Sequence, residues 1–294
     1  MHNSGSSSIP DAVAALRTLC GTRTLYVCPV VSDPLSTRLA AQAGLPSALL
    51  GGFGVSAIGY ALPDAGLITF TDMLAHVRNA AAAAPGFPII ADGDTGYGNA
   101  MNVYRTVSEY ARAGAAGILI EDQVWPKKCG HYGGAREVIP AGEARMKIRA
   151  AVDARKERDI VIMARTDARG GHGFEEAMAR CRAFVEEGAD IVFIEALQSV
   201  DEMRTFASAF PVTWANMMPK TPVVPFTEMQ AMGFRFVTYN VSLAAAAQAM
   251  RTAFTALATN DHDALPPLMP FDELAALVGL NDYTAAEQRY RSAD

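Results

Sequence analysis

The chain has 294 residues, of which 50% are hydrophobic and 19% are charged, and this is enough for one large core or two modest ones. Its formal net charge of −6 and its scattered Lys and Arg residues argue against a nucleic-acid partner or an anionic membrane surface, since both require a basic face. The apolar stretches are too short to span a bilayer. Residues 1–10 are polar and serine-rich and lack the pattern of a secretory signal. We therefore expect a cytoplasmic enzyme with a disordered tail over residues 1–10.

Short apolar runs alternate with longer amphipathic segments along the chain. The amphipathic segments predict helices at residues 72–84, 100–113, 142–157, 174–187 and 241–257. The apolar runs predict eight strands, at residues 25–30, 48–50, 88–91, 117–120, 160–164, 191–194, 212–215 and 236–239. This α/β order predicts a (β/α)8 TIM barrel, with a doubly wound open sheet as the alternative. Because no linker composition interrupts the series, we interpret residues 11–294 as a single barrel domain with a C-terminal helical extension.

Polar side chains stand at the ends of five successive predicted strands. These residues are Asp92 with Asp94, then Glu121, Arg165, Glu195 and Asn216. Because the active sites of such barrels lie at the carboxyl ends of the strands, we expect these side chains to gather at one rim.

Three of these residues, Asp92, Asp94 and Glu121, are carboxylates without a nearby histidine or cysteine in the cluster. Hard oxygen ligands of this kind suit Mg²⁺, with Mn²⁺ also possible, better than zinc. Because Mg²⁺ retains several waters, we expect one or two of the acids to contact it and the others, with Asp64, to hold its waters. Alternatively, Asp94 is only a turn-forming residue before Gly96.

Arg165 presents a planar guanidinium that suits a substrate carboxylate, and Asn216 with the amides of residues 51–54 suits a second one. The predicted ligand is a small dianion. Glu195 could orient Arg165 or a substrate hydroxyl, and a purely structural pair with Arg165 is the alternative. The glycines of residues 51–54 do not indicate a nucleotide site, because the dinucleotide spacing and the Walker lysine are absent.

Residues 125–134, Trp-Pro-Lys-Lys-Cys-Gly-His-Tyr-Gly-Gly, combine a thiol, three cationic or titratable neighbours and several glycines. Two lysines and a histidine favour the thiolate of Cys129, and the glycines allow a segment that closes over a ligand. We predict a catalytic lid on which Cys129 acts as an acid or a base. The alternative is a solvated basic loop with an incidental cysteine.

Five short motifs together resemble the isocitrate lyase and phosphoenolpyruvate mutase superfamily. They are Asp-Gly-Asp-Thr-Gly-Tyr-Gly-Asn at residues 92–99, Ile-Glu-Asp-Gln at 120–123, Lys-Lys-Cys-Gly-His at 127–131, Ala-Arg-Thr-Asp-Ala at 164–168 and Ala-Asn-Met at 215–217. The cysteine motif resembles the branch that cleaves carbon–carbon bonds, which includes methylisocitrate lyases, dimethylmalate lyases and oxaloacetate hydrolases.

This resemblance implies chemistry through an enolate and a homotetramer that swaps the last helix of each barrel between subunits. It implies catalytic roles for Lys127, Cys129 and His131. It further implies an Mg²⁺ site at Asp64, Asp92, Asp94 and Glu121, and substrate contacts from Gly51, Gly52, Phe53, Gly130, Arg165, Glu195 and Asn216.

The expected reaction is cleavage of a 2-hydroxy dicarboxylate, of the 2-alkylmalate or methylisocitrate type, to a 2-keto acid and a carboxylate. In this scheme Cys129 protonates the carbanionic carbon, while Lys127 and His131 stabilise developing charge. The nearest alternative is hydrolysis of oxaloacetate to oxalate and acetate. Phosphonate mutase or hydrolase chemistry, or a non-catalytic protein that binds a metal and a dicarboxylate, are weaker alternatives.

Three positions depart from the pattern of methylisocitrate lyases. Those enzymes place tyrosine and serine where this chain has Leu49 and Gly51, and an arginine where it has Ala245. A third substrate carboxylate would therefore lack its partner, which favours 2-alkylmalates or oxaloacetate as substrates.

Overall fold

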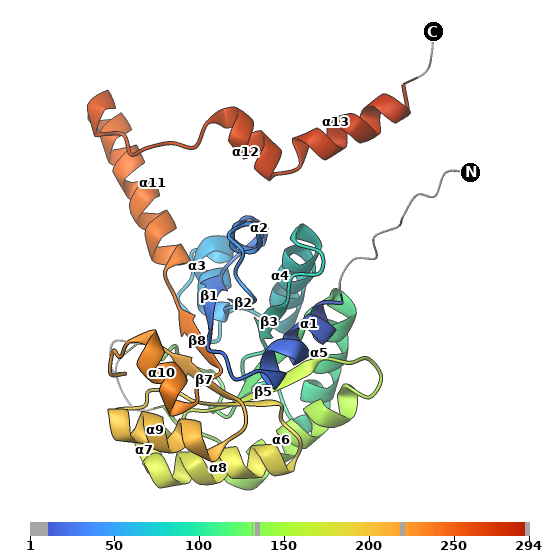
Figure 1. Cartoon of the computed structure of the whole chain (residues 1–294), viewed down its shortest axis with the longest axis vertical. Coiled ribbons are helices and arrows are strands. Elements are labelled where there is room, and N and C mark those ends of the chain that lie inside the picture. The colour runs from blue at the N-terminus through green and yellow to red at the C-terminus, as the bar shows by residue number, and fades with distance from the viewer. Residues whose placement is uncertain (1–10, 131, 133–135, 218–220, 292–294) are drawn as a thin grey trace. The chain divides into compact units, whose positions relative to one another are not determined.

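Eight parallel strands close into a barrel in the computed structural model, which describes residues 11–130, 132, 136–217 and 221–291 (Figure 1). The strands pair in chain order and β8 returns to pair with β1, so the predicted barrel is confirmed and an open sheet is excluded. The tail expected at residues 1–10 lies outside the described residues. The strands are β1 (Tyr26–Val31), β2 (Ala48–Leu50), β3 (Ile89–Asp92), β4 (Gly117–Glu121), β5 (Val161–Thr166), β6 (Ile191–Ile194), β7 (Thr213–Asn216) and β8 (Phe236–Tyr239).

Helices follow the strands along the chain and lie outside the barrel (Figure 1). Within the part of the chain that precedes Ser242 they are α1 (Ala12–Gly21), α2 (Pro34–Gln42), α3 (Gly52–Tyr60), α4 (Phe70–Ala83), α5 (Ala100–Ala113), α6 (Ala141–Ala154), α7 (Arg169–His172), α8 (Phe174–Glu186), α9 (Val200–Ala209) and α10 (Phe226–Met232).

Several strands extend further toward their carboxyl ends than the apolar runs predicted. The ladder continues through polar residues, since Asp92 pairs with Leu119 and Glu121 pairs with Arg165. Asn216 likewise pairs with Thr238 on β8. These polar side chains therefore stand on the last rungs of the barrel, where hydrogen bonds to neighbouring strands fix their backbone.

The interior of the barrel is filled with apolar side chains. Trp214 and Phe236 are fully buried and stack with their ring centroids 5.1 Å apart. Leu16 of α1 is also fully buried and belongs to the same cluster. Because these side chains fill the barrel, a ligand can enter only at an end, as is usual for this fold.

The chain divides into two compact units between Ser242 and Leu243. The second unit contains nearly all of α11 (Ser242–Ala258), the 3₁₀ helix η1 (His262–Ala264), α12 (Phe271–Leu277) and α13 (Leu280–Arg289). Large apolar side chains in this unit are exposed, among them Phe254, Phe271 and Tyr290. None of the helices in the described ranges is both long and apolar enough to cross a bilayer.

Candidate active site

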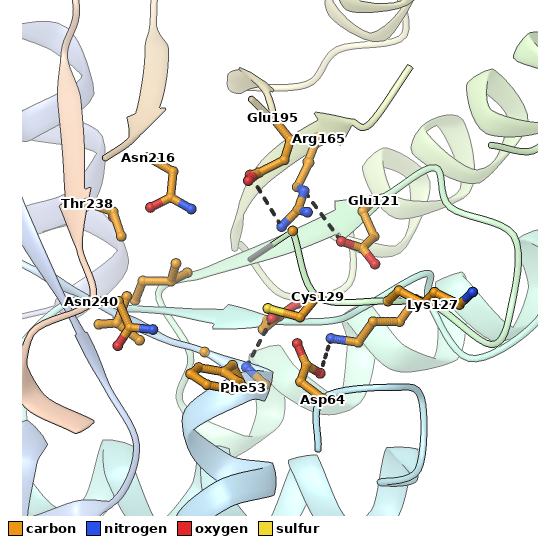
Figure 2. A pocket seen from close by; sticks show the side chains of 17 residues that line it. Phe53, Asp64, Glu121, Lys127, Cys129, Arg165, Glu195, Asn216, Thr238 and Asn240 are labelled. Atoms are coloured by element: carbon orange, nitrogen blue, oxygen red, sulfur yellow. Dashed lines mark hydrogen bonds and ion pairs between the residues drawn. The ribbon is translucent and has the colours of Figure 1, made fainter. Parts of the chain in front are cut away.

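A pocket opens at the carboxyl ends of the strands (Figure 2). Its volume of about 70 Å³ favours a small ligand. Twelve of the fourteen site residues predicted from the sequence line it: Gly51, Gly52, Phe53, Asp64, Asp92, Glu121, Lys127, Cys129, Gly130, Arg165, Glu195 and Asn216. Of the other two, Asp94 is buried and forms an ion pair with Lys127, and His131 lies outside the described residues.

Five further residues that we had not assigned as site residues line the pocket, namely Val30, Leu49, Lys128, Thr238 and Asn240, although Leu49 and Lys128 had been noted in the sequence. Thr238 is on the last rungs of β8 and Asn240 follows that strand directly. The same rule about strand ends, applied to the eighth strand, would have found both. Val30 is apolar, so nothing in its chemistry marked it as a site residue.

A tight turn after β3 positions the first two carboxylates. Asp92 accepts hydrogen bonds from the Gly52 amide and from the Asp94 amide, both at 3.0 Å. The Glu121 amide donates to the Asp94 carbonyl at 2.9 Å, which ties the turn to β4. Gly93 is required at this contact, since a Cβ there would lie 2.8 Å from the Leu119 carbonyl oxygen. The Gly52 amide thus binds Asp92 here, although we expected it to face a substrate carboxylate.

Lys127 places a buried ammonium among the carboxylates. Its Nζ lies 2.5 Å from Asp64 Oδ1 and 2.8 Å from Asp94 Oδ1 (Figure 2 shows the first contact). Burial alone lowers the pKa of Lys127, but Asp94, Asp92 and Asp64 together raise it well above its ordinary value. Lys127 is therefore a fixed cation at neutral pH.

The buried acids of this cluster hold protons more tightly than free carboxylic acids do. Burial raises the pKa of Asp94 to about 6, against the opposing effect of Lys127. Burial also raises the pKa of Glu121 well above its ordinary value, although Arg165 opposes that shift. In both cases the main cause is desolvation of the charged carboxylate, and neighbouring acids add to it.

The donor set fits a hard divalent cation. Asp94 Oδ2 and Glu121 Oε1 are buried and accept no hydrogen bond from any described residue. Within residues 11–130, 132, 136–217 and 221–291, however, no three Asp, Glu, His or Cys side chains are arranged to ligate one ion directly. The cluster therefore suits an ion that keeps several waters, as Mg²⁺ does, better than one that needs a complete protein cage.

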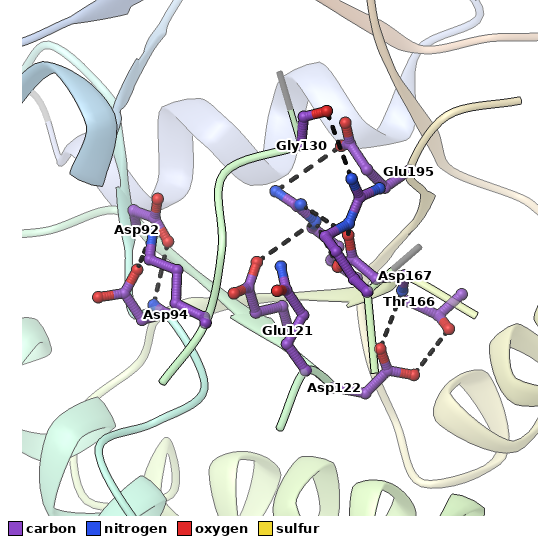
Figure 3. Close-up of polar contacts among 12 residues, drawn as sticks. Asp92, Asp94, Glu121, Asp122, Gly130, Thr166, Asp167 and Glu195 are labelled. Carbon is purple, nitrogen blue, oxygen red and sulfur yellow. Dashed lines mark hydrogen bonds and ion pairs between the residues drawn. The ribbon is translucent and has the colours of Figure 1, made fainter. Parts of the chain in front are cut away.

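Asp167 anchors the guanidinium of Arg165, and the sequence had not predicted Asp167 as a site residue. Both oxygens of Asp167 accept hydrogen bonds from Arg165, from its Nε and from one terminal nitrogen, each at 2.9 Å. The other terminal nitrogen lies 3.7 Å from Glu195 Oε2, and Nε lies 3.4 Å from Glu121 (Figure 3 labels the three acids). The predicted pairing of Arg165 with Glu195 is thus present but loose, and Asp167 provides the main anchor.

The segment that carries Cys129 is attached to the barrel on two sides. The Cys129 amide donates to the Asp64 carbonyl at 3.1 Å, and the Tyr132 hydroxyl accepts from the Asp64 amide at 3.1 Å. On the other side, Arg136 donates to the Gly130 carbonyl at 3.3 Å. Cys129 is 7% exposed, and Figure 2 shows its side chain among those of the pocket.

Comparison with known proteins identifies the family. The sequence pattern of the family described as phosphoenolpyruvate phosphomutase matches residues 16–258. The chain belongs to this family. It is therefore a member of the isocitrate lyase and phosphoenolpyruvate mutase superfamily, as the motifs suggested.

Two curated relatives in this family are carbon–carbon lyases. The 2,3-dimethylmalate lyase of Eubacterium barkeri is 41% identical over 95% of this chain and 98% of its own length. The 2-methylisocitrate lyase of Aeropyrum pernix is also 41% identical, over 91% of this chain and 87% of its own. These similarities place the chain in the carbon–carbon lyase branch of the superfamily.

Two solved structures of family members are informative about ligands. Oxaloacetate acetylhydrolase with the inhibitor 3,3-difluorooxalacetate superimposes with a TM-score of 0.88 at 34% identity, over 97% of this chain and 99% of that one. Phosphonopyruvate hydrolase with oxalate and Mg²⁺ has a TM-score of 0.82 at 32% identity, over 95% and 99% of the two chains.

Proposed function

We propose that the chain is a magnesium-dependent lyase that cleaves a 2-hydroxy dicarboxylate of the 2-alkylmalate type. The observation that carries this proposal is the position of Cys129 in one pocket with Lys127, Arg165 and the carboxylate cluster. A thiol in that place suits delivery of a proton to carbon, which a phosphonate mutase does not require, because a mutase only moves a phosphoryl group between oxygen and carbon. The 41% identity to 2,3-dimethylmalate lyase supports the same reaction.

The residues that would hold Mg²⁺ are Asp64, Asp92, Asp94 and Glu121, one or two directly and the others through water. A bound Mg²⁺ supplies positive charge that stabilises an oxyanion as it develops on the substrate. The orphaned oxygens of Asp94 and Glu121 support this assignment, and so does the Mg²⁺ in the phosphonopyruvate hydrolase structure.

Substrate recognition in this proposal combines one fixed cation with an apolar wall. The guanidinium of Arg165, oriented by Asp167, binds a substrate carboxylate, and Asn216 binds the other. Val30, Leu49 and Phe53 line the pocket and suit an alkyl substituent. Because Leu49 is apolar, the pocket supports a dicarboxylate better than the tricarboxylate methylisocitrate.

The proposed reaction breaks the bond between C2 and C3 of the substrate. The 2-hydroxyl loses its proton to solvent water, C2 becomes the ketone of a 2-keto acid, and the electron pair of the broken bond passes to the C3 fragment as an enediolate. Lys127 stabilises negative charge as it develops. Cys129 then donates its proton to C3, which gives the second carboxylate, and the thiolate regains a proton before the next turnover.

Hydrolysis of oxaloacetate to oxalate and acetate is the second candidate. It is supported by the 0.88 TM-score to oxaloacetate acetylhydrolase. The two candidates share Cys129 as the proton donor to carbon and differ in whether water attacks the substrate.

The deciding experiment is a substrate panel with Mg²⁺ and identification of the products by mass. The panel contains 2-methylmalate, 2,3-dimethylmalate, 2-methylisocitrate and oxaloacetate. We expect a 2-alkylmalate to give a 2-keto acid and a monocarboxylate, with no product when EDTA replaces Mg²⁺. Production of oxalate and acetate from oxaloacetate alone would select the hydrolase, and binding without turnover of any compound would overturn both candidates.

We also propose a homotetramer in which subunits exchange the last helix of the barrel, together with the helices that follow it in the chain. The exposed apolar side chains of the second unit support this, because a soluble monomer rarely leaves so many uncovered. The partner is a second copy of this chain.

A further inference from the structure

Arg136 contacts both the segment that carries Cys129 and the acid that anchors Arg165. It is 9% exposed, and its Nε lies 2.5 Å from Asp167 Oδ1. Another of its nitrogens donates to the Gly130 carbonyl at 3.3 Å. No motif in the sequence marked this residue, because its role depends on where the segment folds.

Asp167 is consequently shared between two guanidinium groups. Its Oδ1 accepts from Arg136 and from Arg165, while its Oδ2 accepts from Arg165 alone. Arg165 and Arg136 together hold the pKa of Asp167 below its ordinary value in spite of burial. The carboxylate is therefore a fixed anion that both cations use as an anchor.

The backbone at Asp167 is itself rigidly placed. Asp122 accepts hydrogen bonds from the Asp167 amide at 2.9 Å and from the Thr166 hydroxyl at 2.7 Å (Figure 3). Arg180 in turn donates to Asp122 at 3.0 Å. The two hydrogen bonds that Arg165 donates to Asp167 are enough to orient Arg165. The third hydrogen bond to the Asp167 carboxylate comes from Arg136 and therefore serves the Cys129 segment.

We propose that Arg136 is a positioning residue that holds the Cys129–Gly130 backbone over the pocket by bridging Gly130 to Asp167. Arg136 does not contact the substrate. The role of Cys129 as proton donor comes from the proposed function, on which this inference rests. The placement of Cys129 can be measured without turnover, so the role of Arg136 and the proposed function can fail separately.

The primary test measures the rate at which iodoacetamide alkylates Cys129 in the Mg²⁺-loaded full-length protein, followed by peptide mass mapping. Arg136→Met removes both hydrogen bonds and the charge. We expect it to raise the alkylation rate at Cys129 at least about tenfold, because Gly130 loses the hydrogen bond that links it to Asp167 through Arg136. Arg136→Lys, which keeps the charge and can reach one of the two acceptors, should restore part of the protection.

Glu137→Gln is the matched control, since Glu137 is the exposed neighbour of Arg136 and should leave the alkylation rate unchanged. Circular dichroism and the melting temperature verify that each variant folds, and Arg136→Lys takes the place of Arg136→Met if the latter does not. Equal alkylation rates in the folded Arg136 variants and the wild type would overturn the proposal.

The second readout separates positioning from a general structural role. Because Arg165 keeps both of its bonds to Asp167, oxalate affinity and KM should change by less than about threefold in Arg136→Met. Turnover should fall about 10- to 100-fold, as expected when a proton donor is misplaced by about 1 Å. A fall in oxalate affinity and a rise in KM as large as the fall in kcat would contradict a role limited to the Cys129 segment.

Discussion

At the scale of single residues, the Lys127 ammonium is the cation that offsets the charge of Asp64 and Asp94. Its removal should be costly, because two buried carboxylates would face each other with no compensating charge. We predict that Lys127→Met lowers the free energy of unfolding by about 3–5 kcal/mol in urea titrations with EDTA present. Lys128→Met, at the exposed neighbouring lysine, should change it little. Equal effects of the two variants would contradict this view of the cluster.

Cys129 gives the second prediction at this scale. A serine hydroxyl is nearly the size of the thiol but a much weaker acid, so Cys129→Ser should reduce kcat by about 10²- to 10⁴-fold. Oxalate and Mg²⁺ binding, followed by calorimetry, should stay within about threefold of the wild type. Cys20→Ser, at the half-buried cysteine of α1, is the control. Wild-type turnover by Cys129→Ser would remove the proton-donor role.

The sequence predicted best those site residues whose position follows from a strand end. Asp92, Glu121 and Asn216 lie at the last rungs of the barrel, so the position of each in its strand fixes its location. Two other contacts depend on the conformation of loops. They are the ion pair of Asp94 with Lys127 and the link that Arg136 makes between Gly130 and Asp167. Such contacts between residues distant in the sequence leave no periodic pattern to detect.

At the scale of elements, α3 is a helix that we did not predict from the sequence. It begins Gly52-Phe53-Gly54, and because glycine has low helix propensity we did not predict a helix there. Packing explains why glycine is needed, because a Cβ on Gly54 would lie 2.1 Å from Ser32 Oγ. The close approach of α3 to β1 therefore overrides the local preference of the chain.

Ion pairs at the other end of the barrel give a prediction about pH. Arg17 of α1 lies 2.5 Å from Asp159, which precedes β5, and 3.2 Å from Asp190, which precedes β6. The hydrogen bond from Arg17 lowers the pKa of Asp159 below its ordinary 3.8. The stabilisation is therefore present above pH 3.8 and is lost as the pH falls through the lower pKa of the folded state.

We predict that Asp159→Asn lowers the free energy of unfolding at pH 7 by about 1 kcal/mol or less, since the pair is partly exposed. The difference from the wild type should shrink as the pH falls below about 3.8, in urea titrations at a series of pH values. Asp263→Asn is the control, because Asp263 is exposed and forms no ion pair with a described residue. A difference that grows at low pH would contradict the assignment.

At the scale of the whole molecule, the two units differ in how they cover their apolar side chains. The barrel unit contains the large clusters of buried side chains, whereas the second unit has few buried residues and several largely exposed aromatic ones. The sequence predicted a helix at residues 241–257 and a helical extension after it, but periodicity does not reveal what covers a helix. That depends on another surface, which the proposed assembly supplies from a second copy.

Assembly can be tested at Phe271, which is 84% exposed in the single chain. In a monomer Phe271→Glu should change little, because it replaces one exposed side chain by another. In the proposed tetramer it would bury an unpaired charge, so we predict dissociation to smaller species in analytical ultracentrifugation, with unchanged circular dichroism. Val223→Glu is the matched control, since Val223 is 82% exposed but belongs to the barrel unit. A tetramer that survives Phe271→Glu intact would show that this helix does not contribute to the interface.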